Sequence, residues 1–128
     1  MAIHDAVRPL VSPALILKSF QVAEERGNCV VGITPTDSVR RVLEEDKNEA
    51  LNRSELALIQ TPQTFRVDLL KKAYQVPFRN DFTDDASVAE YSGMKINLIE
   101  GERENIKITY PEDLDIASFF IKKRSLAK

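Results

Sequence analysis

The alternation of apolar and polar residues along the chain predicts short strands separated by helices. Residues 1–5 form a short apolar stretch that ends in charged residues, which is typical of a strand leading into a polar loop. Ser12 and Pro13 are typical of a helix start and Gly27 of a helix end, so a helix with one apolar side is expected between them. The β-branched run 28–33 then predicts a strand buried in a parallel sheet.

Residues 38–60 interrupt this pattern with a largely polar segment. Two weak apolar clusters, 39–43 and 56–59, flank a charged and turn-prone stretch at 44–52. This arrangement predicts a β-hairpin arm that protrudes from the domain rather than an element of the core.

Helix-capping residues mark three further helices. Thr64 is expected to cap the first, and Thr83, followed by two aspartates, the second. Thr109 and Glu112 have the spacing of a capping box, with a proline between them in the first turn, and they predict the start of the last helix.

Short strands are also expected at 96–99 and 106–108. Strands that alternate with helices predict an α/β domain with right-handed crossover connections. Ligands of such sheets bind at the carboxyl ends of the strands. Asp5, Asp37 and Thr61 are therefore expected on loops at that edge.

Composition places the chain among globular proteins of one domain. Its 128 residues are 43% hydrophobic and 30% charged, with a net charge of −2, which is not the charge of a nucleic-acid-binding protein. The single cysteine, Cys29, lies in an apolar run and is expected to be a buried, small hydrophobic residue. No apolar run has the length of a membrane span and no signal-peptide pattern opens the chain. A cytoplasmic protein without nucleic-acid or membrane partners is expected.

Lys107 is the first candidate for chemistry, because it lies in an apolar stretch directly before a predicted helix start. A cation beside the positive end of a helix dipole is unusual unless an anion shares the site. The alternative is a strand lysine that extends into solvent, and spacing alone favours it. Since Arg8, Arg53 and Thr83 can also bind anions, we interpret the segment as one wall of a phosphate or nucleotide site.

A family resemblance is carried by four segments: 4–9 (His-Asp-Ala-Val-Arg-Pro), 61–65 (Thr-Pro-Gln-Thr-Phe), 83–87 (Thr-Asp-Asp-Ala-Ser) and 105–109 (Asn-Ile-Lys-Ile-Thr). In this order and spacing they resemble the signature segments of 2-C-methyl-D-erythritol 4-phosphate cytidylyltransferases. The resemblance implies a Rossmann-like nucleotidyltransferase sheet in an α/β fold, with helices on both faces and a protruding β-arm. It also implies that the N-terminal nucleotide-binding half, with its glycine-rich loop, is missing, so that residues 1–128 form the C-terminal part of a single domain.

The activity that the resemblance implies is cytidylyl transfer from CTP to 2-C-methyl-D-erythritol 4-phosphate, with release of pyrophosphate, in non-mevalonate isoprenoid biosynthesis. Positioning and charge neutralisation carry such reactions, so Mg²⁺ or another divalent cation is expected with CTP. By the same resemblance Lys107 stabilises the pentavalent phosphorus, while Asp5 and Arg8 line the substrate and ribose region. Asp5 is also a candidate ligand of the metal.

The remaining site residues follow from the same resemblance. Thr61 and Thr83 are expected to donate hydroxyl groups to methylerythritol phosphate. Arg53, on the arm, is expected to reach across a homodimer to the phosphate of substrate held by the other subunit. Ser38 stands where the family usually has threonine, and it keeps the hydroxyl group.

Simpler roles stay open for several of these residues. Arg8 and Asp5 could pair or cap locally, and His4 is expected to be hydrogen-bonded rather than a general base, because the attacking phosphate is already ionised. Two other functions also stay open: a ribitol-phosphate-type polyol cytidylyltransferase, and a non-catalytic, truncated module for dimerisation. Without the nucleotide-binding half, the chain alone is expected to lack activity.

Overall fold

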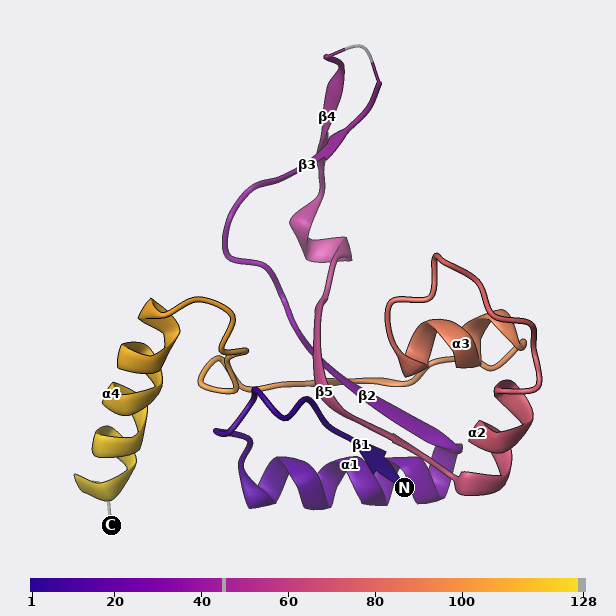
Figure 1. The fold of residues 1–128 in the computed structure, drawn as a ribbon, viewed down its shortest axis with the longest axis horizontal. Helices are drawn as coiled ribbons and strands as arrows, with labels where there is room; N and C mark the ends of the chain where they lie inside the picture. The colour runs from indigo at the N-terminus through magenta and orange to yellow at the C-terminus, as the bar shows by residue number, and fades with distance from the viewer. Residues whose placement is uncertain (45, 127–128) are drawn as a thin grey trace.

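The computed structural model describes residues 1–44 and 46–126, which form a four-stranded sheet, a separate hairpin and flanking helices (Figure 1). The elements follow one another as β1 (Ala2–Ile3), α1 (Pro13–Arg26), β2 (Asn28–Ile33), β3 (Val39–Val42), β4 (Asn48–Leu51), the 3₁₀ helix η1 (Arg53–Glu55), β5 (Leu58–Phe65), α2 (Val67–Ala73), α3 (Asp85–Tyr91), β6 (Leu98–Glu100) and α4 (Glu112–Leu126). The predicted α/β class is confirmed. No helix in the described part of the chain is both long and apolar enough to cross a membrane.

The sheet is mixed, with the strand order β1-β5-β2-β6. β2 runs parallel to β6, as the sequence predicted, but antiparallel to β5, which also runs antiparallel to β1. The purely parallel sheet expected around 28–33 was therefore wrong on one side of β2. The reason is that β5 returns directly from the hairpin, without a crossover helix that would reverse the chain.

Helices cover the two faces of this sheet, and strand alternation sorts the side chains between them. On one face Val30 and Phe65 pack in a buried cluster with residues of α2 and α3 (Leu70, Ala73, Ala86, Val88 and Ala89). On the other face Thr64 lies against α1, where its hydroxyl is 2.9 Å from that of Ser19. Figure 1 shows α1 below the strands and α3 above them. Cys29 is fully buried, as predicted.

Helix α1 begins and ends where the sequence predicts. The Ser12 hydroxyl accepts the N–H of Leu15 at 3.0 Å, and a proline occupies the first turn. Gly27 ends the helix with a φ of 91°, and its N–H donates to the carbonyl of Ala23. Only glycine adopts this left-handed conformation without strain, so the end of the helix is fixed by one residue.

Three predicted helix caps were wrong in position. Thr64 is fully buried within β5, and α2 begins only at Val67, because ladders to both β1 and β2 hold residues 58–65 extended. At α3 the cap is Asp84 rather than Thr83. Its carboxylate accepts the N–H of Ser87 at 2.8 Å, and the Ser87 hydroxyl accepts the N–H of Asp84 in return.

The third error concerns the segment around Lys107. Helix α4 begins at Glu112, and the carboxylate of Asp113 accepts the N–H groups of Thr109 and Tyr110, each at 2.8 Å. A capping box of Thr109 and Glu112 is therefore not formed. Residues 106–108 belong to no strand, although the N–H of Ile108 donates to the carbonyl of Val7 at 2.8 Å.

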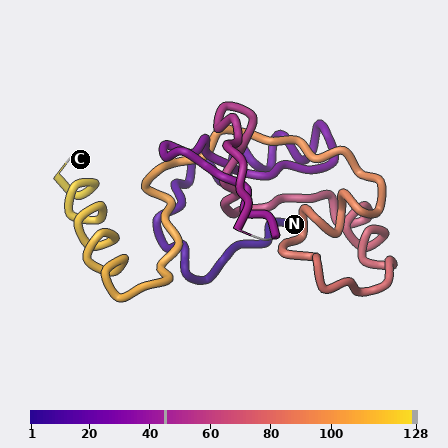
Figure 2. The backbone as a smooth tube through the Cα atoms, turned by 90° about the horizontal axis from the view of Figure 1, so that it is seen from above, coloured from indigo at the N-terminus to yellow at the C-terminus, as the bar shows by residue number. Residues whose placement is uncertain are grey.

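The predicted arm is present as the antiparallel pair β3 and β4, which makes a two-stranded sheet of its own and projects from the main sheet (Figure 1). The segment that leads from the arm back to the sheet is shorter than expected, because residues 58–60 already belong to β5. Helix α4 lies apart from the sheet in both views (Figure 2). Strand β6 covers 98–100 instead of 96–99.

Candidate active site

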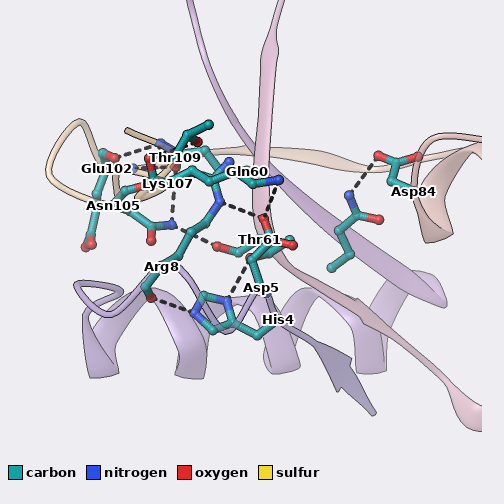
Figure 3. Close-up of polar contacts among 11 residues, drawn as sticks. His4, Asp5, Arg8, Gln60, Thr61, Asp84, Glu102, Asn105, Lys107 and Thr109 are labelled. Atoms are coloured by element: carbon teal, nitrogen blue, oxygen red, sulfur yellow. Dashed lines mark hydrogen bonds and ion pairs between the residues drawn. The ribbon is translucent and has the colours of Figure 1, made fainter. Parts of the chain in front are cut away.

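Three charged side chains meet beside the end of β1, as Figure 3 shows. Asp5 Oδ2 lies 3.1 Å from Arg8 Nε and 3.8 Å from Lys107 Nζ. Asp5 and Arg8 share a turn, closed by a bond from Arg8 N–H to the Asp5 carbonyl, which brings their side chains together. Lys107 comes from the segment before α4, so residues about a hundred positions apart in the sequence make one cluster.

The three side chains differ in their exposure to solvent. Lys107 is 52% exposed and Asp5 is 34% exposed, whereas Arg8 is only 11% exposed. Arg8 is also anchored by a 2.8 Å bond from Nη1 to the carbonyl of Asn105. Two cations against one carboxylate leave the cluster with an excess positive charge, and the exposed ammonium of Lys107 is the part that an incoming anion reaches first.

Thr61 and His4 join the cluster from β5 and from the end of β1. The Thr61 hydroxyl accepts the N–H of Asp5 at 3.0 Å and lies 2.8 Å from Nδ1 of His4. The other ring nitrogen, Nε2, lies 2.8 Å from the carbonyl of Arg8, which can only accept. In a neutral ring Nε2 therefore carries the proton, and Thr61 donates its hydroxyl proton to Nδ1. The expectation of a hydrogen-bonded His4 is confirmed.

The other predicted site residues lie elsewhere. Arg53 and Ser38 are exposed near the base of the arm, and Nη1 of Arg53 donates to the carbonyl of Thr36. Thr83 is exposed just before α3, and Asp84 lies on the opposite side of Figure 3 from the cluster. Asp5 and Asp37 lie on loops as predicted, whereas Thr61 lies within β5.

Thr83 lines an open hollow of about 490 Å³ beside the sheet. Its walls come from four elements, and they include Val30 of β2, Ile59 of β5, Ser87 of α3 and Leu98 of β6. The structure thus brings Asp5, Arg8, Thr61 and Lys107 together by direct contacts. It places Thr83 in a separate hollow, which none of these four residues lines.

Two residues at the site were not singled out from the sequence. Gln60 precedes Thr61 and is 5% exposed, and Asn105 opens the segment that carries Lys107 and is fully buried. Both make hydrogen bonds that hold this segment against β5. No pattern in the sequence marked Gln60, because its strand also contains the polar residues Thr61, Gln63 and Thr64.

The donor set for a divalent cation is small. Among the described residues no group of three His, Cys, Asp or Glu side chains could hold a metal ion. Mg²⁺ is commonly bound by one or two carboxylates together with substrate phosphates. Asp5 is the carboxylate that the cluster offers for such an arrangement.

Comparisons with known proteins show which family this chain resembles. Residues 1–123 match the family profile of IspD, 2-C-methyl-D-erythritol 4-phosphate cytidylyltransferase. The relative from Bacteroides fragilis is 48% identical over 118 residues, which cover 92% of this chain and 53% of the relative. The relative from Porphyromonas gingivalis is 43% identical over 122 residues, which cover 94% of this chain and 54% of the relative.

Solved structures of cytidylyltransferases superpose on this chain. The 2-C-methyl-D-erythritol 4-phosphate cytidylyltransferase of Thermus thermophilus superposes with a TM-score of 0.81 at 29% identity, over 94% of this chain and 61% of that one. The 4-diphosphocytidyl-2C-methyl-D-erythritol synthase of Anaerococcus prevotii gives 0.84 at 29% identity, over 94% of this chain and 56% of that one. The chain spans about half the length of the curated relatives it matches. The resemblance seen in the sequence is confirmed, and the chain belongs to the family of 2-C-methyl-D-erythritol 4-phosphate cytidylyltransferases.

Proposed function

We propose that the protein carrying this chain transfers a cytidylyl group from CTP to 2-C-methyl-D-erythritol 4-phosphate and releases pyrophosphate, in the cytoplasm and with Mg²⁺. One observation carries the proposal: Lys107, Arg8 and Asp5 meet at the end of β1, beside the hydroxyl of Thr61. A partly exposed, positively charged cluster of this kind suits a reaction between two phosphate groups.

Each charged residue has a role that follows from its contacts. The phosphate of the substrate is largely ionised near neutral pH, so it attacks the α-phosphorus without a general base. Lys107 is free to move toward the pentavalent phosphorus, since its ion pair with Asp5 is long and exposed. Arg8 is held from two sides and supplies a fixed positive charge.

Thr61 has one hydrogen-bonding capacity left over. With a neutral His4, its hydroxyl proton is committed to Nδ1, and one lone pair accepts the N–H of Asp5. The second lone pair remains for a donor. We therefore assign Thr61 as an acceptor for a hydroxyl group of the polyol, instead of the donor to methylerythritol phosphate expected from the sequence.

Residues outside the cluster imply partners. Arg53 and Ser38 lie near the base of the arm, and both are exposed. Their exposure suits contacts across a homodimer that forms through the arm at 38–60. Phe20 of α1 and Phe119 of α4 are 44% and 61% exposed, which leaves apolar surface uncovered on both helices. We infer that the nucleotide-binding half of a single nucleotidyltransferase domain covers this surface and supplies the cradle for the CTP phosphates.

The test compares residues 1–128 alone with the same chain joined to the N-terminal part of the Bacteroides fragilis relative, here called the joined enzyme. Pyrophosphate release is measured with CTP, Mg²⁺ and either methylerythritol phosphate or ribitol phosphate. We expect turnover with methylerythritol phosphate in the joined enzyme and none in the chain alone. Turnover with ribitol phosphate alone would show that the substrate is a ribitol phosphate rather than methylerythritol phosphate. A joined enzyme that dimerises without turnover would replace catalysis by an assembly role.

A further inference from the structure

We propose that Gln60 and Asn105 form an amide lock, a pair of buried side chains that positions Lys107 and Arg8 for the transfer reaction. The inference rests on the proposed function, because it concerns residues that act through Lys107 and Arg8. Gln60 is 5% exposed and Asn105 is fully buried, and both are drawn beside the charged cluster in Figure 3.

Gln60 binds the loop that precedes Lys107 with both ends of its amide. Nε2 donates to the carbonyls of Glu102 at 2.9 Å and of Asn105 at 3.3 Å. Oε1 accepts the N–H of Glu102 at 3.3 Å and the Nδ2 of Asn105 at 3.4 Å. A single side chain of β5 thus fixes a whole turn of backbone, which is itself closed by a bond from Asn105 N–H to the Glu102 carbonyl.

Asn105 connects this turn to the residues of the cluster. Its Nδ2 donates to the carbonyl of Thr61 at 2.8 Å, and its own carbonyl accepts Nη1 of Arg8 at 2.8 Å. Lys107 follows two residues later, and two residues of chain span at most about 7 Å. Because residues 106–108 belong to no strand, the place of Lys107 depends on the lock and on the Ile108–Val7 bond.

The chemistry of Asn105 indicates more than packing. Its Oδ1 is buried without a hydrogen-bond partner among the described residues, which costs stability. An apolar side chain of similar size would avoid that cost. The donation from Nδ2 to the carbonyl of Thr61 sets the position of the segment on β5. A requirement of the site for this position explains why an amide occupies residue 105.

Asn28, the first residue of β2, provides a matched control, because it is a second buried amide far from the cluster. Asn28 is 1% exposed, its Nδ2 donates to the carbonyl of Lys95 at 2.8 Å, and its Oδ1 accepts the N–H of Asn97 at 2.9 Å. This second buried amide also fixes a segment next to a strand, yet it contacts none of the cluster residues. Loss of the Asn28 amide should destabilise the fold at least as much as loss of the Asn105 amide, because Asn28 uses both its Nδ2 and its Oδ1 in hydrogen bonds, whereas Oδ1 of Asn105 has no partner among the described residues.

The experiment uses the joined enzyme with Asn105→Leu, Gln60→Met and, as the control, Asn28→Leu. Each change keeps the approximate size of the side chain and removes its hydrogen bonds without burying a charge. Thermal midpoints are measured first, and turnover is then measured well below the lowest midpoint. We expect Asn28→Leu to lower the midpoint at least as much as Asn105→Leu, so that a larger loss of turnover in Asn105→Leu cannot come from lower stability.

Turnover separates a positioning role from a structural one. We expect kcat to fall by about tenfold to a hundredfold in Asn105→Leu and Gln60→Met, with the KM for CTP little changed, and to stay near the parent value in Asn28→Leu. Equal kcat values for Asn105→Leu and Asn28→Leu would overturn the inference. If Asn105→Leu does not fold, Gln60→Met alone decides. An inactive parent enzyme refutes the proposed function instead, so the two failures are distinguishable.

Discussion

The ammonium nitrogen of Lys107 lies 3.8 Å from Oδ2 of Asp5. Both side chains are partly exposed, so this ion pair contributes only about 0–1 kcal/mol to stability and is easily exchanged for a contact with another anion. Arg8 differs, because it is nearly buried and holds the same carboxylate oxygen at 3.1 Å. The cluster therefore combines one fixed cation with one that a phosphate can recruit.

Lys107→Ala in the joined enzyme should lower kcat far more than it raises the KM for either substrate. The ammonium is needed most when negative charge accumulates on the phosphorus, and its ground-state contact is weak. Steady-state kinetics check this. Lys123→Ala is the control, since Lys123 is also exposed and paired with a carboxylate, that of Glu104 at 2.8 Å. An unchanged kcat in Lys107→Ala would remove this residue from the mechanism.

Arg8→Lys should lower the free energy of unfolding by about 1–3 kcal/mol, because a lysine cannot bridge Asp5 and the carbonyl of Asn105 with two fixed donors. Urea denaturation of the joined enzyme measures the loss. Arg66→Lys serves for comparison, since Arg66 is 54% exposed and pairs with Asp68 on the surface. That change should stay within about 0.5 kcal/mol. Equal effects of the two substitutions would mean that Arg8 is no more than a surface pair.

The elements that were predicted correctly depend on local signals. Helix α1 is fixed by Ser12 at its start and by Gly27 at its end, and the hairpin arm by a charged turn between two weak apolar clusters. Two of the errors have a different cause. Thr64 and residues 106–108 were misassigned because their partners lie far away in the sequence, on β1, β2 and the loop after β1.

The residues of the site also divide into those that the sequence marks locally and those that only long-range contacts reveal. Asp5, Arg8, Thr61 and Lys107 could be chosen from motifs, because their residue types are those that bind phosphates and polyols. Gln60 could not, since its partners are backbone groups more than forty positions away and an isolated glutamine has many possible uses. The direction of a hydroxyl group also needs coordinates, because the Thr61 proton is assigned only through the carbonyl that faces His4.

Thr61→Val should raise the KM for methylerythritol phosphate, whereas Thr61→Ser should preserve it. Valine keeps the shape of threonine but has no acceptor for a polyol hydroxyl, and it leaves the partly buried N–H of Asp5 without its partner. Stability should also fall, by about 1–3 kcal/mol, in the valine variant alone. Kinetics and urea denaturation of the joined enzyme test both points. A KM that is unaffected by valine would contradict the assigned contact with the polyol.

Cys29 should behave as a neutral, unreactive thiol until the protein unfolds. It is fully buried, and burial raises its pKa from 9.0 to about 11. A thiol reagent at pH 8 should therefore label the native protein slowly and the urea-unfolded protein at once.

The raised pKa of Cys29 also determines how stability depends on pH. The neutral form stabilises the fold fully below about pH 9, and this contribution is lost as the pH rises toward 11. Lysines and tyrosines titrate in the same range, so the informative quantity is the difference between the parent and Cys29→Ala. The alanine variant should lose less stability between pH 9 and 11, and identical alkaline losses in the two proteins would show that the thiol does not ionise with unfolding.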